Sequence, residues 1–179
     1  EVYAIRFQPL AAEYIIKKTI SNLLNTGIKV SHEDYSFFHE IDSEYQNFDS
    51  FAESNTKILK AKLAKGKPID SRKQKLFRIL FNSNGSISLS QVSDEVAWSD
   101  RQIRRYFSSV LGLSFKDYAN ILRLHSTYKD LVKGEHYPDN PYYFDQSHYI
   151  KEIKKHTGVN PKTLLKNKTT DFYNYELGQ

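Results

Sequence analysis

The chain has 179 residues, of which 39% are hydrophobic and 14% aromatic, and it contains no cysteine. This composition can supply ordinary hydrophobic cores, and the lack of cysteine excludes disulfides, thiolate metal sites and cysteine nucleophiles. The longest apolar runs are too short to cross a membrane and the first residues do not resemble a signal peptide, so we expect a cytoplasmic protein with no membrane partner.

Positive charge is concentrated in the second part of the chain. The formal net charge is +5. Residues 1–68 hold nine Lys/Arg and nine Asp/Glu, whereas residues 69–179 hold seventeen and twelve, so the whole excess (17 − 12 = 5) lies in the second part. A basic region of this kind suggests a polyanionic partner, although a solvated charged surface produces the same asymmetry.

Residues 1–67 are interpreted as the end of one domain followed by a linker. Residues 2–7 alternate as in a strand, residues 10–24 have apolar residues at helical spacing, and residues 31–53 predict short helices whose aromatic side chains form a core or a ligand pocket. The basic stretch 58–67 then meets Gly66 and Pro68, which indicate a domain boundary. Because the chain begins without methionine in an expected strand, we expect residues 1–67 to be the C-terminal part of a longer sensor or dimerisation domain.

The second part, residues 68–179, begins with three expected helices. One, capped by Asp70 or Ser71, runs through residues 71–81. Two short helices follow, the first capped by Ser88 or Ser90 and the second by Ser99. The inward residues of this pair are expected to be Val92, Val96, Ile103, Phe107 and Val110, with Trp98 packed in the core beside the turn. Two short helices that share an apolar face across a tight turn are typical of a helix-turn-helix.

A longer helix starting at Ser114 is expected to connect this unit to a second one. Its expected inward residues are Tyr118, Ile121, Leu122 and His125, with Tyr128 and Leu131 as further candidates. A helix over residues 145–156, capped by Asp145 and with Tyr149 and Ile153 inward, then leads through Gly158 to a closing helix. The predicted fold class is therefore mainly α, with two helix-turn-helix units joined by a connector helix and preceded by a short strand and helices from a truncated N-terminal domain.

The helix after Ser99 has a stripe of arginines on its expected outward face. Arg101, Arg104, Arg105 and Ser108 follow the spacing i, i+3, i+4 and i+7, which places them on one side of a helix. Arginine has a planar fork that can bond guanine O6 and N7 together, and the same group neutralises phosphate. The stripe therefore predicts DNA contact, and the alternative is a solvated basic face.

The second recognition helix has a less basic set of outward residues, namely Gln146, Ser147, Ile150 and Lys151. Glutamine can pair with adenine, lysine with guanine or phosphate, and isoleucine can pack on a thymine methyl, although Ile150 could instead pack against the connector helix. Contacts to DNA phosphates are expected from Ser108, Lys154, Lys155, Lys162 and Lys166. Each of these lysines taken singly is no different from an ordinary surface lysine.

The stretch SLSQVSDEVAWSDRQIRRYFSSVLGLSFKDYANILRLHSTYKDL, followed by YYFDQSHYIKEIKKHTGVNPKTLL, resembles the DNA-binding domain of the AraC/XylS family. The similarity covers more than half the chain and includes caps, glycines, apolar positions and an Asn-Pro step in one order. It implies a bacterial, sequence-specific regulator of transcription that binds double-stranded DNA through residues 68–179. It also places Arg101, Arg104 and Arg105 at the family's base-reading positions. The segment YAIRFQP resembles the last strand of the sensor region in some members.

The chain departs from the family pattern before the second recognition helix. A helix usual in the family is replaced by GEHYPDNPYY, which is shorter and contains two prolines, and Tyr142 stands at a common glycine position. These changes put the first helix of the second unit in doubt. The alternative function is a protein-interaction module with the same fold that has lost DNA binding, and salt-dependent binding to duplex DNA would distinguish the two.

We expect neither an enzyme nor a bound cofactor or metal. The histidine pairs His32/His39 and His148/His156 lack zinc-like spacing, and there is no phosphate-binding loop, dinucleotide fingerprint or nucleophile with its base. Besides duplex DNA, RNA polymerase and a second copy bound through the N-terminal region are candidate partners. The sequence identifies no small-molecule effector.

Overall fold

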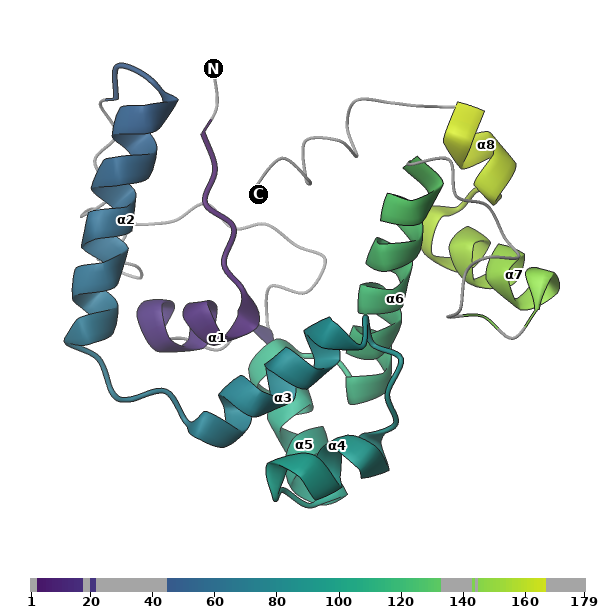
Figure 1. Cartoon of the computed structure of the whole chain (residues 1–179), viewed down its shortest axis with the longest axis horizontal. Helices are drawn as coiled ribbons and strands as arrows, with labels where there is room; N and C mark the ends of the chain where they lie inside the picture. The colour runs from purple at the N-terminus through teal and green to yellow at the C-terminus, as the bar shows by residue number, and fades with distance from the viewer. Residues whose placement is uncertain (1–2, 18–19, 22–44, 133–142, 144, 167–179) are drawn as a thin grey trace. The chain divides into compact units, whose positions relative to one another are not determined.

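The computed structural model describes residues 3–17, 20–21, 45–132, 143 and 145–166, and this part of the chain is mainly helical (Figure 1). The chain divides into two compact units. Unit 1 takes in Glu1–Ile79 and Ser88–Asp117, and unit 2 takes in Leu80–Ile87 and Tyr118–Gln179. No helix within the described residues is long and apolar enough to cross a membrane.

The N-terminal segment of unit 1 is a short helix without the expected strand. Residues 3–8 belong to no strand, and α1 (Pro9–Ala11) passes directly into a π-helical turn, η1 (Ala12–Ile16). The predicted helix over residues 10–24 is wrong in length, because Lys17 has a left-handed backbone (φ 59°) that ends the helical hydrogen bonds. Residues 22–24 lie outside the described residues.

The next helix, α2 (Phe48–Ala64), is a single long helix where the pattern predicted several short ones. Asn47 begins it through a capping box, in which its side chain accepts a hydrogen bond from the Ser50 amide at 2.9 Å. Phe51 is buried and packs edge-on against Tyr45, with 4.9 Å between ring centroids, whereas Phe48 is 59% exposed. The core interpretation therefore holds for Phe51 and is wrong for Phe48, and residues 31–44 lie outside the described part.

The linker between α2 and α3 (Ser71–Asn82) contains the predicted domain boundary. Asp70 accepts the Arg72 amide at 2.9 Å, as expected of the residue that caps α3. Both sides of the linker belong to unit 1. The division into residues 1–67 and 68–179 stays a prediction.

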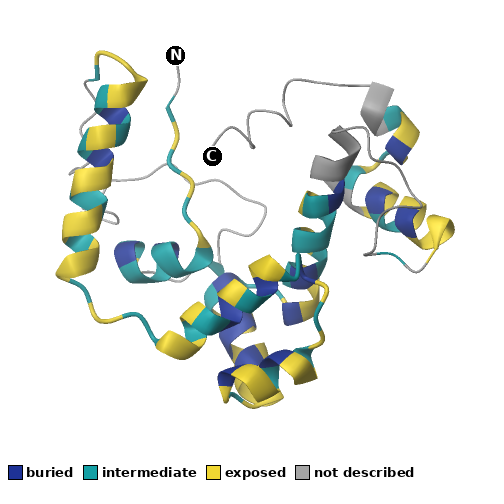
Figure 2. Ribbon diagram, in the orientation of Figure 1, coloured by how far each residue is buried: buried dark blue, intermediate teal, exposed yellow. Residues whose placement is uncertain are grey.

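The main core of unit 1 is formed by α3, α4 (Leu89–Val96) and α5 (Asp100–Tyr106), as the buried faces in Figure 2 show. Ser88 and Ser99 cap α4 and α5, and the side chain of the third helical residue bonds back to each cap in a capping box. Both helices therefore begin where the sequence predicted. The side chains at the centre of this core are Leu76, Phe77, Val92, Val96, Ile103 and Phe107, each no more than 2% exposed.

A π-helical turn, η4 (Phe107–Leu111), continues α5 to Gly112. Gly112 has φ +76°, and a Cβ at this position would lie 2.6 Å from the carbonyl oxygen of Ser21, so both the backbone and the close approach require glycine. Leu111 is buried, whereas Val110, the residue expected inward, is only half-buried. The π turn has more residues per turn than an α-helix, and it therefore rotates Val110 further from the face that Phe107 and Leu111 share.

The long helix α6 (Phe115–Val132) begins at Ser114, whose hydroxyl accepts the Asp117 amide at 3.0 Å, as predicted. The predicted inward face is wrong for two residues, since Ile121 is 44% exposed and His125 is also exposed. Within unit 2, Ala119 and Thr127 are buried instead, and Tyr118 and Leu122 are half-buried. The side chains of residues 128–132 lie outside the described part.

The loop at Gly85 determines which face of α6 is covered. Gly85 has φ +73°, and a Cβ there would lie 2.2 Å from the carbonyl oxygen of Ala119, so the loop backbone rests directly on α6. Nη1 of Arg123 also donates to the Gly85 carbonyl at 3.1 Å. A backbone contact of this kind has no apolar signature in the sequence, which explains why helical periodicity misplaced Ile121 and His125.

The described remainder of unit 2 is formed by α7 (Gln146–Thr157) and α8 (Pro161–Lys166). Tyr149 and Ile153 are buried, as predicted, and Leu124 and Tyr143 pack against them. Asp145 caps α7 by accepting the His148 amide at 2.7 Å. Of the segment GEHYPDNPYY, residues 134–142 lie outside the described residues and Tyr143 is described. The side chains of residues 164–166 also lie outside the described part.

Candidate nucleic-acid interface

The outward face of α5 is built as the arginine spacing predicted. Arg101, Arg104 and Arg105 are all exposed, while Ile103 and Phe107 on the opposite side are fully buried. The exposed outer surface of α5 is visible in Figure 2. Burial on one side therefore fixes the helix so that the three guanidinium groups face solvent.

Within the described part of the chain, no hydrogen bond or ion pair engages the guanidinium groups of these three arginines. Asp100 lies in the first turn of α5, the position in which a carboxylate complements the helix dipole. Three positive charges within two turns attract an anionic ligand and repel a cationic one. The arginine face is therefore chemically suited to phosphate or to the acceptor edge of a base.

Ser108 continues the arginine face onto η4 and is exposed. Its hydroxyl donates to the carbonyl oxygen of Arg105 at 3.1 Å. The hydroxyl must therefore rotate away from its own helix before it can donate to a phosphate. Its contribution to binding is accordingly expected to be small.

The turn that precedes α5 is held by local contacts. Ala97 has a left-handed backbone with φ 53°, and the Ser93 hydroxyl donates to the Trp98 carbonyl at 2.5 Å. The half-buried Trp98 ring packs against Tyr106, with 5.6 Å between centroids, and the Arg72 guanidinium lies 5.1 Å from the Trp98 ring centroid. The packing role expected of Trp98 is thus confirmed, and the turn is fixed on the side away from the arginine face.

The predicted site residues of α7 are also exposed, and they are Gln146, Ser147, Ile150 and Lys151. Asp145 and the buried pair Tyr149 and Ile153 orient this helix. Ile150 is 39% exposed, which groups it with the outward residues. The predicted base-reading set of α7 contains one positive charge, Lys151, where that of α5 has three.

The lysines expected at phosphates are exposed wherever their side chains are described. Lys154, Lys155 and Lys162 all face solvent, and the Nζ of Lys155 lies 4.0 Å from a carboxylate oxygen of Glu152. An exposed pair at this distance contributes little to stability and leaves the ammonium available to another anion. The Lys166 side chain lies outside the described residues.

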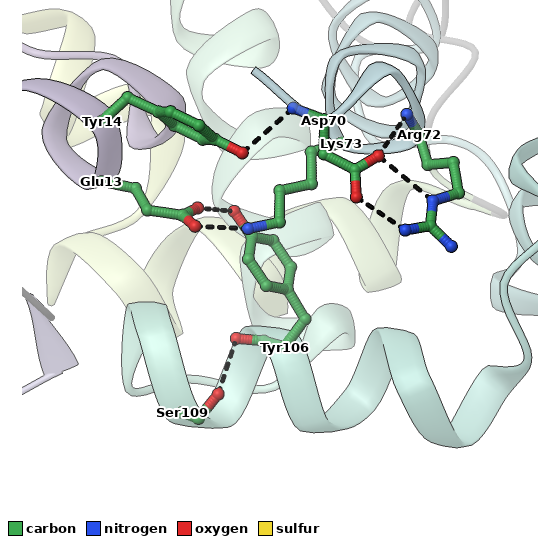
Figure 3. A network of polar contacts seen from close by, with 7 residues as sticks. All are labelled: Glu13, Tyr14, Asp70, Arg72, Lys73, Tyr106 and Ser109. Carbon is green, nitrogen blue, oxygen red and sulfur yellow. Dashed lines mark hydrogen bonds and ion pairs between the residues drawn. The ribbon is translucent and has the colours of Figure 1, made fainter. Parts of the chain in front are cut away.

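A polar network on the buried side of α5 was not predicted from the sequence (Figure 3). The Tyr106 hydroxyl donates to Oε2 of Glu13 at 2.6 Å, and Lys73 forms an ion pair with Oε1 of the same carboxylate. The Lys73 ammonium also lies 4.7 Å from the Tyr106 ring centroid. These residues come from η1, α3 and α5, so no local spacing in the sequence could have indicated that they meet.

The N-terminal turn of α3 lies next to this polar network (Figure 3). Hydrogen bonds from the Arg72 side chain, at 3.1 and 2.8 Å, lower the pKa of Asp70 to about 2. The amide of Asp70 donates to the Tyr14 hydroxyl at 3.0 Å. The segment at residues 13–14 therefore contacts both the start of α3 and the buried side of α5.

Comparison with known proteins adds no family assignment, since no family model, curated protein or solved structure matches this chain. Within the described residues, no three histidine, aspartate or glutamate side chains are grouped so that they could hold a metal ion.

Proposed function

We propose that the chain is a sequence-specific regulator of transcription that binds double-stranded DNA. In this proposal α4 and α5 form one helix-turn-helix, and α7 is the recognition helix of a second. The observation that carries the proposal is the exposed stripe of Arg101, Arg104 and Arg105, whose guanidinium groups form no ion pair with the described residues. Guanidinium groups placed along one helix face are suited to guanine edges and phosphates in a major groove.

The resemblance to the AraC/XylS family supports the same function and suggests how the work is divided. Base reading is assigned to the three arginines of α5 and to the outward residues of α7, which are Gln146, Ser147, Ile150 and Lys151. Phosphate contact is assigned to Ser108, Lys154, Lys155, Lys162 and Lys166, and it adds affinity without sequence information. RNA polymerase and a second copy of the chain remain candidate partners, and no catalysed reaction or cofactor is proposed.

Selection of bound duplexes from a random pool, followed by titration against salt, tests this function. We expect enrichment of one sequence, and a logarithm of the binding constant that falls linearly with the logarithm of salt concentration, by roughly 0.9 per phosphate contacted. A chain that enriches no sequence and shows weak salt dependence would instead be the interaction module. A triple variant with Arg101, Arg104 and Arg105 changed to alanine separates specific enrichment from background retention.

A further inference from the structure

The segment Pro9–Ile16, here called the N-terminal strap, holds α5 from the side opposite its arginines. We propose that Glu13 in this strap is a positioning residue for DNA recognition. Its carboxylate accepts from Tyr106 of α5 and from Lys73 of α3 at the same time, and this fixes the rotation of α5 against α3 (Figure 3). The inference rests on the proposed function, because Glu13 would control how the arginine side chains of α5 are oriented toward DNA.

The setting of Glu13 makes its contacts stronger than surface contacts. Its side chain is 23% exposed, that of Lys73 is 16% exposed, and Tyr106 is 8% exposed. Charges that are partly withdrawn from water interact through a lower effective dielectric, and hydrogen bonds to an ionised acceptor are stronger than neutral ones. The Glu13–Lys73 ion pair and the Tyr106 hydroxyl thus form a strong polar contact on the otherwise apolar side of α5.

Tyr106 links this contact to the arginine face because it follows Arg105 directly in α5. Its ring packs at 5.6 Å from Trp98 and at 6.3 Å from Phe77, so apolar packing holds the body of the side chain. The bond to Glu13 holds its far end. Rotation of α5 about its axis would pull the Tyr106 phenol away from the Glu13 carboxylate, so the contact opposes that rotation. This matters for base readout, because it requires side chains placed to within about 0.5 Å.

Two further contacts hold the same region of the chain against other parts of unit 1. The Asp70 amide donates to the Tyr14 hydroxyl at 3.0 Å, which joins the strap to the start of α3. Just beyond the strap, the Ile20 amide donates to the Val110 carbonyl at 3.1 Å, on the turn that continues α5. Residues near Glu13 are therefore hydrogen-bonded to the start of α3 and to the turn that continues α5. These bonds limit the movement of the Glu13 carboxylate.

Two substitutions in the full chain weaken or remove the contact between Glu13 and Tyr106 with little change of shape. Glu13→Gln removes the charge and keeps the size, and Tyr106→Phe removes only the hydroxyl. Glu53→Gln makes the same chemical change at an exposed position of α2 and is the matched control. Affinities for the selected duplex, for its single-base variants and for an unrelated duplex are measured at one salt concentration, together with amide hydrogen exchange of the free protein.

We expect Glu13→Gln and Tyr106→Phe each to reduce discrimination between the selected duplex and its single-base variants by about threefold to tenfold, the size expected for weakening one charge-assisted hydrogen bond. Affinity for the unrelated duplex should be unchanged, because phosphate contacts need less precise geometry. The double variant should lose less than the sum of the two single losses, because the Tyr106–Glu13 hydrogen bond is common to both. Amides of residues 103–111 should exchange faster in Glu13→Gln, and Glu53→Gln should match the parent chain.

The inference is overturned if both variants keep the parent's discrimination, or if they weaken all duplexes equally while the melting temperature falls, since Glu13 is then only a general stabiliser. If the parent chain binds no duplex selectively, the proposed function fails, and hydrogen exchange still decides the positioning role. Faster exchange confined to α5 and η4 supports that role. Unchanged exchange, or exchange that is faster throughout unit 1, overturns it.

Discussion

The hydroxyl of Tyr106 and the carboxylate of Glu13 are joined by a 2.6 Å hydrogen bond, although 93 residues separate them in the chain. The bond reaches the buried side of α5, and the arginines occupy its exposed side. Changes to the arginines therefore leave the packing of the helix intact. They are expected to alter DNA binding without altering the free energy of unfolding.

Arg105→Ala should reduce affinity for the preferred duplex by about 1–3 kcal/mol and relax preference at one or two base pairs, as expected for loss of a bidentate contact. Lys151→Ala on α7 should lower affinity more evenly across sequences. Affinities for a panel of single-base duplex variants measure both effects, and Arg78→Ala, at an exposed arginine of α3, is the control. Greater loss of discrimination in Lys151→Ala than in Arg105→Ala would reverse this division of labour.

Lys155→Ala should weaken binding to every duplex by a similar factor. If Lys155 contacts a phosphate, the slope of the logarithm of the binding constant against the logarithm of salt should become shallower by about one. Salt titrations of the parent chain and the variant measure the slope. Lys60→Ala, at an exposed lysine of α2, is the control, and an equal change of slope in that variant would contradict a specific role for Lys155.

Gly112→Ala should lower the free energy of unfolding more than Gly158→Ala does. Both glycines have left-handed backbones, with φ +76° and +77°, and a side chain in this conformation costs about 1–2 kcal/mol. A Cβ at Gly112 would in addition approach the Ser21 carbonyl oxygen to 2.6 Å, whereas a Cβ at Gly158 would meet nothing within 4 Å. Urea unfolding measures the loss of unfolding free energy in each variant, and the difference between the two losses reports the contact with Ser21. Equal losses would show that this contact does not affect stability.

Thr127→Val should destabilise unit 2 by about 1–3 kcal/mol, the cost of leaving a buried polar group without its partner. Thr127 is fully buried, and its hydroxyl oxygen lies 3.1 Å from that of Tyr143. Adding Tyr143→Phe should cost little more, because the unpaired phenol is then removed as well. The unfolding free energies of the parent chain, the two single variants and the double variant form a double-mutant cycle. Strictly additive losses of unfolding free energy would indicate that the two hydroxyls do not interact.

The ionised form of Asp70 should stabilise the protein in a defined pH range. The pKa of Asp70 falls from 3.8 to about 2 on folding, chiefly through the side-chain hydrogen bond from Arg72. A lowered pKa means that the stabilisation is complete above pH 3.8 and is lost as the pH falls through about 2. The urea midpoints of the parent chain and Asp70→Asn should therefore differ near neutral pH and converge in acid. Asp94→Asn, at an exposed carboxylate, is the control.

Local chemistry explains which structural predictions succeeded. Ser88 and Ser99 are followed three residues later by glutamine, and the resulting capping boxes set the starts of α4 and α5 without help from distant residues. The pair Tyr149 and Ile153 is similarly indicated by helical spacing alone. The exposure of the arginine face follows from the same spacing, because the opposite face is strongly apolar.

The failures come from contacts between segments far apart in the chain. Ile121 was expected inward, but the backbone at Gly85 covers the neighbouring face of α6 at Ala119. Tyr106 stands three residues after the inward Ile103, so helical spacing is compatible with its burial but does not identify its partners. Its burial depends on Trp98, Phe77 and the distant strap, which a periodicity argument does not include.

The contacts of the N-terminal strap also limit where this chain can be cut and fused to another protein. A hybrid joined at Pro68, the boundary that the sequence favours, would separate Glu13 from Lys73 and Tyr106. The foreign segment would then have to supply a carboxylate at the same place, or the hybrid would lack the contacts that Glu13 makes with Lys73 and Tyr106. A fusion that keeps the native chain from Pro9 onward avoids this defect and is the sounder starting point for a biosensor.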